Sequence, residues 1–133
     1  MLKLEIVTPE KRILDAQVES VTVPTASGEA GILANHAPLI SALKPGILTY
    51  TNRGSTEKLA VSSGFVEVNS DTVSVMVDSA ETADEIDLQA ARSDRENAEK
   101  AIAAAGLVES DAAVQNRDAV DLASARIQLA AGK

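Results

Sequence analysis

The period of the hydrophobic pattern changes near residue 84, and this change limits the possible folds more than any other feature of the sequence. Before residue 84 apolar residues alternate with polar ones, as in Leu2–Val7, Phe65–Val68 and Thr72–Val77. Such alternation is typical of β-strands with one buried face. After residue 84 alanine dominates, and apolar residues recur at helical spacing. We therefore expect a β-domain over residues 1–84 and a helical region over residues 85–133.

Turn residues divide the first region into many short strands. Asn69-Ser70-Asp71 joins two β-rich runs and predicts a hairpin between them. Val18, Val21 and Val23 do not keep one parity, so we expect a bulge or a register change near Glu19-Ser20. Frequent turns between short strands favour a β-sandwich. The other turn signals are Gly28, Gly31, Pro45-Gly46, Asn52-Arg53-Gly54 and Gly64.

The second region predicts two helices joined as an antiparallel hairpin. Asp84 or Asp87 can cap the start of the first helix, and Gly106 is a natural stop at its end. Ser110 or Asp111 can cap the second helix, and the short link between the two makes them neighbours. The residues that fall at helical spacing in the first helix are Leu88, Ala91, Arg95, Ala98, Ile102 and Ala105, and the apolar residues of the second are Val114, Val120, Ile127 and Leu129.

The alanines of this region limit how firmly the hairpin can pack on the β-domain. At ~25 cal/mol per Å² of apolar surface, a stripe of alanine contributes much less than a stripe of leucine. Alanine is also the best helix former, so the helices can keep their shape while their packing stays weak. The sequence leaves two alternatives open: a hairpin that detaches, and one that stays on the sandwich.

Composition argues against several classes of function. Aromatic residues make up only 2% of the chain, which leaves no stacking platform for single-stranded nucleic acid. The net charge of −8 opposes binding to phosphate backbones, so the expected partners are proteins and not nucleic acid. No stretch approaches the roughly 20 apolar residues of a membrane span, and the N-terminal run is too short for a signal peptide. Contact with a membrane is expected only through a partner.

The sequence offers few candidate residues for catalysis or for metal binding. The chain has no cysteine, so disulfides, thiol nucleophiles and thiolate metal sites are excluded. His36 is the only histidine, and no serine, threonine and acid stand at spacings that indicate a triad around it. Gly28-Glu29-Ala30-Gly31 lacks the lysine of a phosphate-binding loop. We expect no metal, no resident cofactor and no independent catalysis.

The segment Val23–Gly46 carries the most specific local pattern. Pro24 is expected to end a strand, and the glycines that follow permit tight backbone geometry around an exposed Glu29. Ile32-Leu33 is expected to re-enter the core, and Asn35–Pro38 to turn, with the residue before the proline held extended. A surface loop braced at both ends by core residues suits a rigid contact site.

This segment resembles the epsilon subunit of F-type rotary ATP synthases. In that family a proline, paired glycines, an Asn/Gly-His-Ala-Pro-Leu run and a Pro-Gly turn occur in this order. The resemblance continues through Ser63–Val68 and Val73–Ala80 and runs into the helices, so that it covers nearly the whole chain. The combination of Gly31–Pro38 with Gly64–Val68 is highly specific, whereas either alone is weak.

The resemblance implies a non-catalytic rotor subunit in the central stalk of a proton-translocating ATP synthase. Its sandwich would sit on the gamma subunit and on the ring of c subunits. Glu29, Gly31, Asn35 and His36 would contact the c-ring, with Glu29 facing basic or polar groups. From the residues alone, His36 is equally well a turn residue bonded to backbone, and Glu29 a solvated carboxylate.

Some bacterial members of the family bind ATP through a motif at the start of the first helix, Ile/Leu-Asp-x-x-Arg-Ala. Here the run from Ile86 and Asp87 keeps the Ile, the Asp and the final Ala, but Ala90 stands in place of the arginine. Arg92 lies roughly 200° further around the helix, so it cannot substitute directly, although Arg117 or Arg126 of the second helix is available. Phosphate binding needs the charge and fork geometry of arginine. We therefore expect weak or absent ATP binding, with Asp87 acting as a helix cap.

The resemblance also implies a regulatory hairpin, which in the family can extend along gamma and block ATP hydrolysis in the alpha/beta hexamer. Basic residues of the last helix usually assist that form, and here they are Arg117 and Arg126. Residues 85–133 carry nine acidic and six basic residues, a net charge of −3. We expect inhibition weakened by poor electrostatic complementarity. From the residues alone, the two arginines are equally well solvated helix charges.

Two further expectations concern context. The lack of a presequence and of cysteine favours the cytoplasmic face of a bacterial inner membrane, with the plastid thylakoid as the alternative. A rival function is a free-standing β-sandwich interaction adaptor with a helical tail, which requires the motif match to be accidental.

Overall fold

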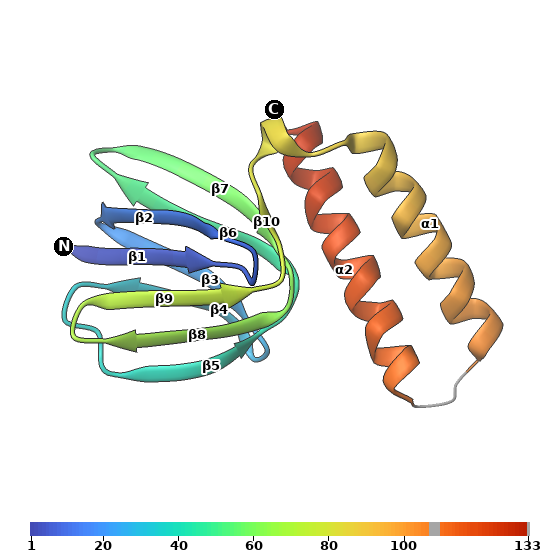
Figure 1. Ribbon diagram of the computed structural model, residues 1–133, viewed down its shortest axis with the longest axis horizontal. Coiled ribbons are helices and arrows are strands. Elements are labelled where there is room, and N and C mark those ends of the chain that lie inside the picture. The colour runs from blue at the N-terminus through green and yellow to red at the C-terminus, as the bar shows by residue number, and fades with distance from the viewer. Residues whose placement is uncertain (107–109, 133) are drawn as a thin grey trace.

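The computed structural model describes residues 1–106 and 110–132, as a β-sandwich followed by two packed helices (Figure 1). Ten strands come first and the helices last. The strands are β1 (Leu2–Val7), β2 (Arg12–Val18), β3 (Ser20–Thr25), β4 (Gly28–Leu33), β5 (Leu39–Leu43), β6 (Gly46–Asn52), β7 (Ser55–Val61), β8 (Gly64–Asn69), β9 (Thr72–Val77) and β10 (Ala80–Glu81). The helical elements are η1 (Ala83–Glu85), α1 (Leu88–Ala105) and α2 (Asp111–Ala131).

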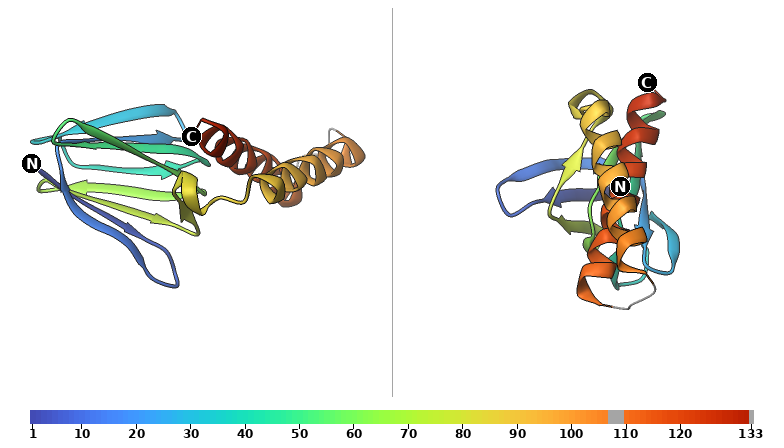
Figure 2. Two further views of the ribbon diagram at one scale, coloured as in Figure 1. Left: turned by 90° about the horizontal axis from the view of Figure 1, so that it is seen from above. Right: turned by 90° about the vertical axis from the view of Figure 1, so that its right-hand side faces the viewer.

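The strands form one continuous sheet that folds over into two layers. Its order is β10-β7-β6-β3-β5-β8-β9-β1-β2, and β4 pairs with β3 off this path. All pairs are antiparallel except β1 with β9. The two layers join through a single pair, Thr25 with Leu43, where the sheet turns over. Figure 2 shows the two layers of the sandwich with the helices projecting beyond one end of it.

The core lies between the two layers and is almost wholly aliphatic. It follows from the period-two pattern, because alternate residues of β1, β8 and β9 point inward and are buried. No helical residue belongs to this cluster, so the sandwich has a core of its own. The buried members are Leu2, Leu4, Ile6, Val18, Val21, Val23, Ile32, Leu43, Leu48, Leu59, Val61, Val66, Val68, Val73, Val75, Val77 and Ala80.

The local predictions for the strands are largely confirmed. β8 and β9 form the expected hairpin, and Ser70 and Asp71 take the positive φ that its tight turn requires. The parity change after Val18 comes from a bend at Glu19. There the chain leaves β2, which pairs with β1, and enters β3, which pairs with β6. The Glu19 side chain then accepts a hydrogen bond of 2.7 Å from the Arg53 N–H. The expected break therefore lies between two strands and not within one.

The segment after Val23 is a β-hairpin, which corrects the expectation of a surface loop. Pro24 lies within β3 and pairs with Glu29 of β4, and the turn between the strands is at Ala26-Ser27. Pro24 lies beyond the part of β3 that pairs with β6, so its missing N–H costs no ladder bond. The expectation that Leu33 is buried was wrong: the residue is 63% exposed because it shares the outward face of β4.

The helices begin and end where the capping residues predict. The Asp87 carboxylate accepts from the Ala90 N–H at 3.0 Å, and the Ser110 hydroxyl accepts from the Ala113 N–H at 3.1 Å. Gly106, at φ 71°, caps the end of α1. α2 packs along α1 and lies over β6 and β7. About four residues were expected in the link, and three of them, 107–109, lie outside the described residues.

Small side chains form the inner surfaces of the hairpin. The fully buried helical residues of the described ranges are Ala91, Ala98, Ala123 and Ala125. Among the residues at helical spacing, Ala91 and Ala98 are buried, whereas Arg95, Ala105 and Val114 are exposed. α2 packs on both α1 and the sheet, and the buried side chains at these contacts are alanines.

Candidate functional site

The predicted contact residues lie along the free edge of β4 and the turn that follows it. β4 pairs only with β3, so its other edge has no strand partner among the described residues. Glu29, Gly31 and Leu33 share the outward, exposed parity of the strand. They span about 13 Å, from the rise of a β-strand. We call Glu29, Gly31, Leu33, Asn35 and His36 the β4 edge.

The turn at the end of the β4 edge is held by backbone geometry and a neighbouring hairpin. Asn35 has a φ of 66°, in the left-handed region that asparagine tolerates better than most residues. Its N–H donates to the Asp71 carboxylate at 2.7 Å, which ties this turn to the β8–β9 turn. His36 Nδ1 lies 2.6 Å from the Ala37 carbonyl oxygen, so the ring is fixed against its own turn. Both predicted roles of His36, turn residue and contact residue, are compatible with this position.

The other end of the β4 edge lies beside the helices. Glu29 lines an open cleft of about 610 Å³ together with Lys44, Lys58 and, from α2, Asp121 and Gln128. The four predicted contact residues are therefore on one strip, but Glu29 and His36 stand at its opposite ends. A partner that covers the whole strip passes close to α2.

Pro24 and Gly46, which both line this cleft, are in close contact. A Cβ added at Gly46 would lie 2.9 Å from the Pro24 Cβ, so the proline ring packs directly on the glycine backbone. The Thr25 hydroxyl also donates to the Gly28 carbonyl across the β3–β4 turn. These contacts make the strand pair a rigid base for the β4 edge.

Sequence reasoning missed an exposed apolar row on the outside of the other layer. Val7, Ala42, Phe65 and Met76 stand side by side on the four adjacent strands β1, β5, β8 and β9, because Ala42 pairs with Phe65, Phe65 with Met76, and Met76 with Val7. Phe65 is 57% exposed and Met76 47%. We call these four residues the outer apolar row. Its signal was present in the sequence, since Phe65 and Met76 have the opposite parity to the buried valines of the same strands.

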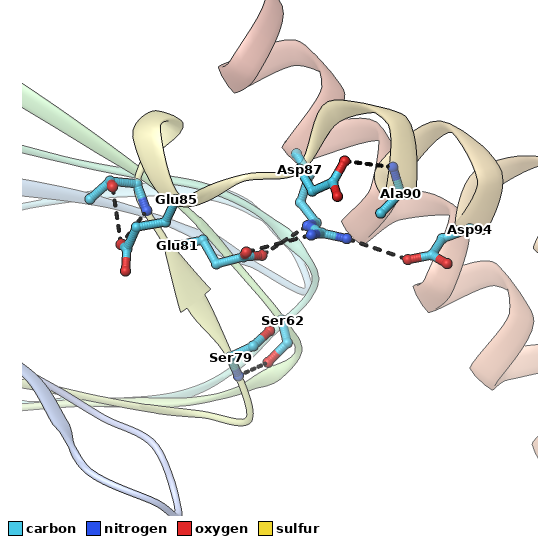
Figure 3. A network of polar contacts seen from close by, with 9 residues as sticks. Ser62, Ser79, Glu81, Glu85, Asp87, Ala90 and Asp94 are labelled. Atoms are coloured by element: carbon cyan, nitrogen blue, oxygen red, sulfur yellow. Dashed lines mark hydrogen bonds and ion pairs between the residues drawn. The ribbon is translucent and has the colours of Figure 1, made fainter.

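The predicted nucleotide residues have separate partners in the structure. Asp87 caps α1 through Ala90, as expected for a structural role. Ile86 follows η1 as its C-cap, and Arg92 lines a groove between the helices with Arg95, Glu96 and Lys100 among its neighbours. Arg126 points instead to Glu81 and Asp94 (Figure 3). Phosphate-binding sites need their cations to converge on one point, and these do not.

The linker between sandwich and helices is fixed by hydrogen bonds at both of its ends. Ser62 accepts from the N–H groups of Asp78 and Ser79 at 2.9 and 3.0 Å, where the chain leaves β9. The Thr82 N–H and hydroxyl both donate to Glu85 Oε1 at 3.0 Å, a capping box at η1. These two bonds hold the pKa of the Glu85 carboxyl below its ordinary value. The two regions are thus joined by an ordered connection.

Arg117 lies exposed in the first half of α2. It is more than two turns before Arg126 along α2, so the two predicted regulatory arginines do not form one cluster. None of the helices in the described ranges combines the length and the apolar character that a membrane span needs. Within residues 1–106 and 110–132 there is also no group of three or more acidic or histidine side chains that would suit a metal ion.

Comparisons of the sequence with known proteins agree on one family. Residues 1–83 match the family model described as the beta-sandwich domain of the ATP synthase Delta/Epsilon chain. The ATP synthase epsilon chain of Desulfitobacterium hafniense strain Y51 is 45% identical over 97 residues, which cover 73% of this chain and 74% of that one. The epsilon chain of Desulfosudis oleivorans is 47% identical over 100 residues, covering 74% of this chain and 75% of that one.

Solved structures give the same answer for the fold. A chain in the cryo-EM structure of the Euglena gracilis mitochondrial ATP synthase, with OSCP, F1 and c-ring, superposes with a TM-score of 0.78 at 25% identity. The match covers 99% of this chain and 81% of that one. The family match over the sandwich, the identities near 45% and this shared architecture together show that the chain belongs to the epsilon chains of ATP synthases, and with that family it is a non-catalytic accessory subunit of the complex.

Proposed function

We propose that this chain is a central-stalk rotor subunit, which couples the gamma subunit to the c-ring and restrains ATP hydrolysis through its helices. The observation that carries the proposal is the presence of two different exposed surfaces on one rigid sandwich. The outer apolar row lies on one layer, and the polar β4 edge lies on the other. A rotor link needs two such faces, because it has to hold one partner firmly while it contacts a second.

The outer apolar row is the proposed seat of the gamma subunit. An exposed row of four apolar side chains across adjacent strands is costly in water and is typical of a permanent protein contact. Ile40, 74% exposed on β5, extends the apolar surface beyond the row. Large apolar and aromatic residues carry most of the binding energy at protein interfaces, and Phe65 is the only phenylalanine of the chain.

The β4 edge is the proposed contact with the c-ring. An unpaired strand edge presents backbone N–H and C=O groups, and Gly31 lets a partner approach that backbone closely. Glu29 supplies one negative charge toward basic or polar groups of the ring, and Asn35 and His36 complete the strip at the far end. The contact would be polar and shallow, as suits a surface that transmits torque through shape.

The hairpin is the proposed regulator, acting through the alpha/beta hexamer, with Arg117 and Arg126 as its basic contacts. Deleting residues 85–133 is expected to raise ATP hydrolysis by the assembled synthase about twofold. This value assumes that about half of the complexes are in the inhibited form, all of which the deletion would release. The truncation leaves the sandwich core intact, because every buried member of that cluster lies between Leu2 and Ala80. Hydrolysis is measured at a matched content of this chain in the complex. An unchanged rate would mean that the hairpin is structural only.

ATP is not proposed to control the hairpin. The site lacks an arginine at Ala90, and the nearest alternative, Arg126, already neutralises two carboxylates. Calorimetric titration of the full chain with Mg-ATP is expected to show a Kd weaker than about 1 mM, since each missing charge-assisted bond removes roughly 1.5–3 kcal/mol. Micromolar affinity would contradict this part of the proposal.

The proposed location follows from the complex and not from the chain. The relatives reported above are bacterial epsilon chains, which supports a position at the cytoplasmic face of the bacterial inner membrane. The chain would lie there peripherally, held through gamma and the c-ring.

A further inference from the structure

Arg126 joins three elements of the fold at one point. From α2, its Nε lies 2.8 Å from Glu81 Oε1 on β10, and its Nη2 lies 3.5 Å from Glu81 Oε2. Its Nη1 lies 3.4 Å from Asp94 Oδ2 on α1. Figure 3 shows the dashed lines that run from Glu81 on the sandwich side and from Asp94 on the helix side to the same guanidinium group. One cation therefore ties the sheet to both helices.

The two carboxylates are not equal partners. The Glu81 side chain is 28% exposed, and its carboxylate faces the guanidinium group with both oxygens. Oε1 forms an ion pair with Nε at 2.8 Å, although the Nε–H makes no hydrogen bond, and Oε2 accepts a hydrogen bond from Nη2 at 3.5 Å. The Asp94 side chain is 62% exposed and receives a single longer contact. The Arg126 side chain itself is only 15% exposed, so water screens its pair with Glu81 less than it screens a surface pair. The bond between α2 and the sheet is thus the principal one.

The rest of the hairpin contact offers little to replace this bond. α2 lies over β6 and β7, whereas α1 packs along α2. The fully buried helical side chains of the described ranges are all alanines, which bury small apolar areas. An open cleft also separates part of α2 from the β5–β6 turn, next to Ala125. With weak apolar packing, a single partly buried ion pair has a large influence on whether the hairpin stays in place.

We propose that Arg126 and Glu81 form a salt-sensitive latch that holds the hairpin on the sandwich, with Asp94 keeping α1 in line. Its release would free the helices from the sheet without unfolding either region, since the sandwich core contains no helical residue. The latch is a property of the chain by itself, and its consequence for ATP hydrolysis rests on the function proposed above. Ionic strength, and not a bound nucleotide, sets the balance between docked and released hairpin.

The test uses the full chain and a single reporter thiol, because the sequence has no cysteine. Ala125→Cys places a thiol on the face of α2 that is turned to the sheet, where the side chain is 5% exposed. Release of the hairpin is therefore expected to speed its reaction with a thiol reagent. In this background R126M is expected to speed labelling by roughly tenfold, because it removes the charge but keeps an unbranched apolar side chain. Raising the salt concentration from about 0.05 to 0.5 M should speed labelling of the parent and leave R126M unchanged.

Matched variants separate the latch from general loosening. R95M removes an arginine whose ion pair, in the part of the chain that the structure describes, is with Glu99 of the same helix, and it should not change the labelling rate. E81Q should match R126M, and the double variant should be no faster than either, because both remove the same bond. A thiol at Val66, in the sandwich core, should label at the same slow rate with and without R126M. A change at Val66 would mean that the sandwich itself had been destabilised.

Two results would overturn the latch: equal labelling of the parent and R126M, or an effect of R126M that survives unchanged in the E81Q background. The latch and the regulatory function can fail separately. Faster labelling of E81Q, which keeps Arg126 for the proposed contact with the hexamer, together with unchanged hydrolysis by the assembled synthase would keep the latch and remove its regulatory consequence. Unchanged labelling would remove the latch whatever the synthase does.

Discussion

Gly64→Ala is expected to destabilise the protein by about 3 kcal/mol or more, the upper part of the range for forced overpacking. A Cβ at this position would lie 2.0 Å from the Met76 carbonyl oxygen and 3.0 Å from the Val77 Cα, both backbone atoms of β9. Backbone cannot move aside as a flexible side chain can, so the β8 and β9 strands have to separate at the Gly64–Val77 pair. Chemical denaturation of the full chain measures the loss, which is a large share of a typical stability of 5–15 kcal/mol.

Gly31→Ala is the matched control, since it makes the same chemical change in another strand. A Cβ at Gly31 meets no atom within 4 Å, so the variant should unfold within about 0.5 kcal/mol of the parent. Equal stabilities for the two variants would show that β8 and β9 do not approach each other as described. They would also weaken the argument for the outer apolar row, because that row is built on the same strand pairing.

Phe65→Lys is expected to weaken binding of the chain to the gamma subunit by roughly 30- to 1000-fold, or about 2–4 kcal/mol. The substitution puts a charge at the centre of the outer apolar row, where binding would have to remove it from water without a partner. Phe65 is more than half exposed in the free chain, so the folded structure should be little affected. Titration of purified gamma with each variant gives the affinity, and thermal denaturation confirms the fold.

Val114→Lys serves as the matched control for the binding experiment. It also replaces an exposed apolar side chain by lysine, but on α2, away from the outer apolar row. Its affinity for gamma should equal that of the parent. If both variants bind as the parent does, gamma sits elsewhere on the chain. If both weaken binding equally, the loss comes from charge in general and not from this surface.

Local signals in the sequence were sufficient for the main features of the fold. The period change, the Asn69–Asp71 turn and the caps at Asp87, Gly106 and Ser110 all depend on interactions within a few residues. Those interactions are present whatever the remainder of the chain does. For that reason the fold class, the β8–β9 hairpin and the helical hairpin were correctly predicted from residues alone.

The predictions that failed depend on which strands become neighbours. Nothing local indicates that β4 pairs only with β3, and this pairing turns a predicted loop into a strand and exposes Leu33. The outer apolar row likewise forms only when β1, β5, β8 and β9 align in register. Such contacts come from chain segments far apart in sequence, which a periodicity cannot pair.

The candidate site was partly predictable for the same reason. Glu29, Gly31, Asn35 and His36 were identified through the family resemblance, and the structure adds that they form a strip along one strand edge. Their contact with a c-ring stays a prediction. The role of Arg126 could not be predicted, because Glu81 lies 45 residues away and on another element. Its charge was visible in the sequence, but its partner was not.

In the alanine-rich hairpin, the weak packing predicted from the sequence agrees with the side chains that the structure buries. The sequence predicted helices that form readily and pack weakly, and the buried helical side chains of the described ranges are alanines. The structure shows the hairpin on the sandwich, with an ion pair at the contact. The two alternatives left open by the sequence thus become a question of how tightly that ion pair holds.

The most direct test of the central claim is the association of this chain with its own gamma subunit. Purified full chain and gamma are mixed at micromolar concentrations and separated by size-exclusion chromatography with mass determination. A central-stalk rotor subunit is expected to elute with gamma as a stable 1:1 complex, and the Phe65→Lys variant separately from it. Separate elution of the parent chain and gamma would contradict the account and would favour a free-standing adaptor.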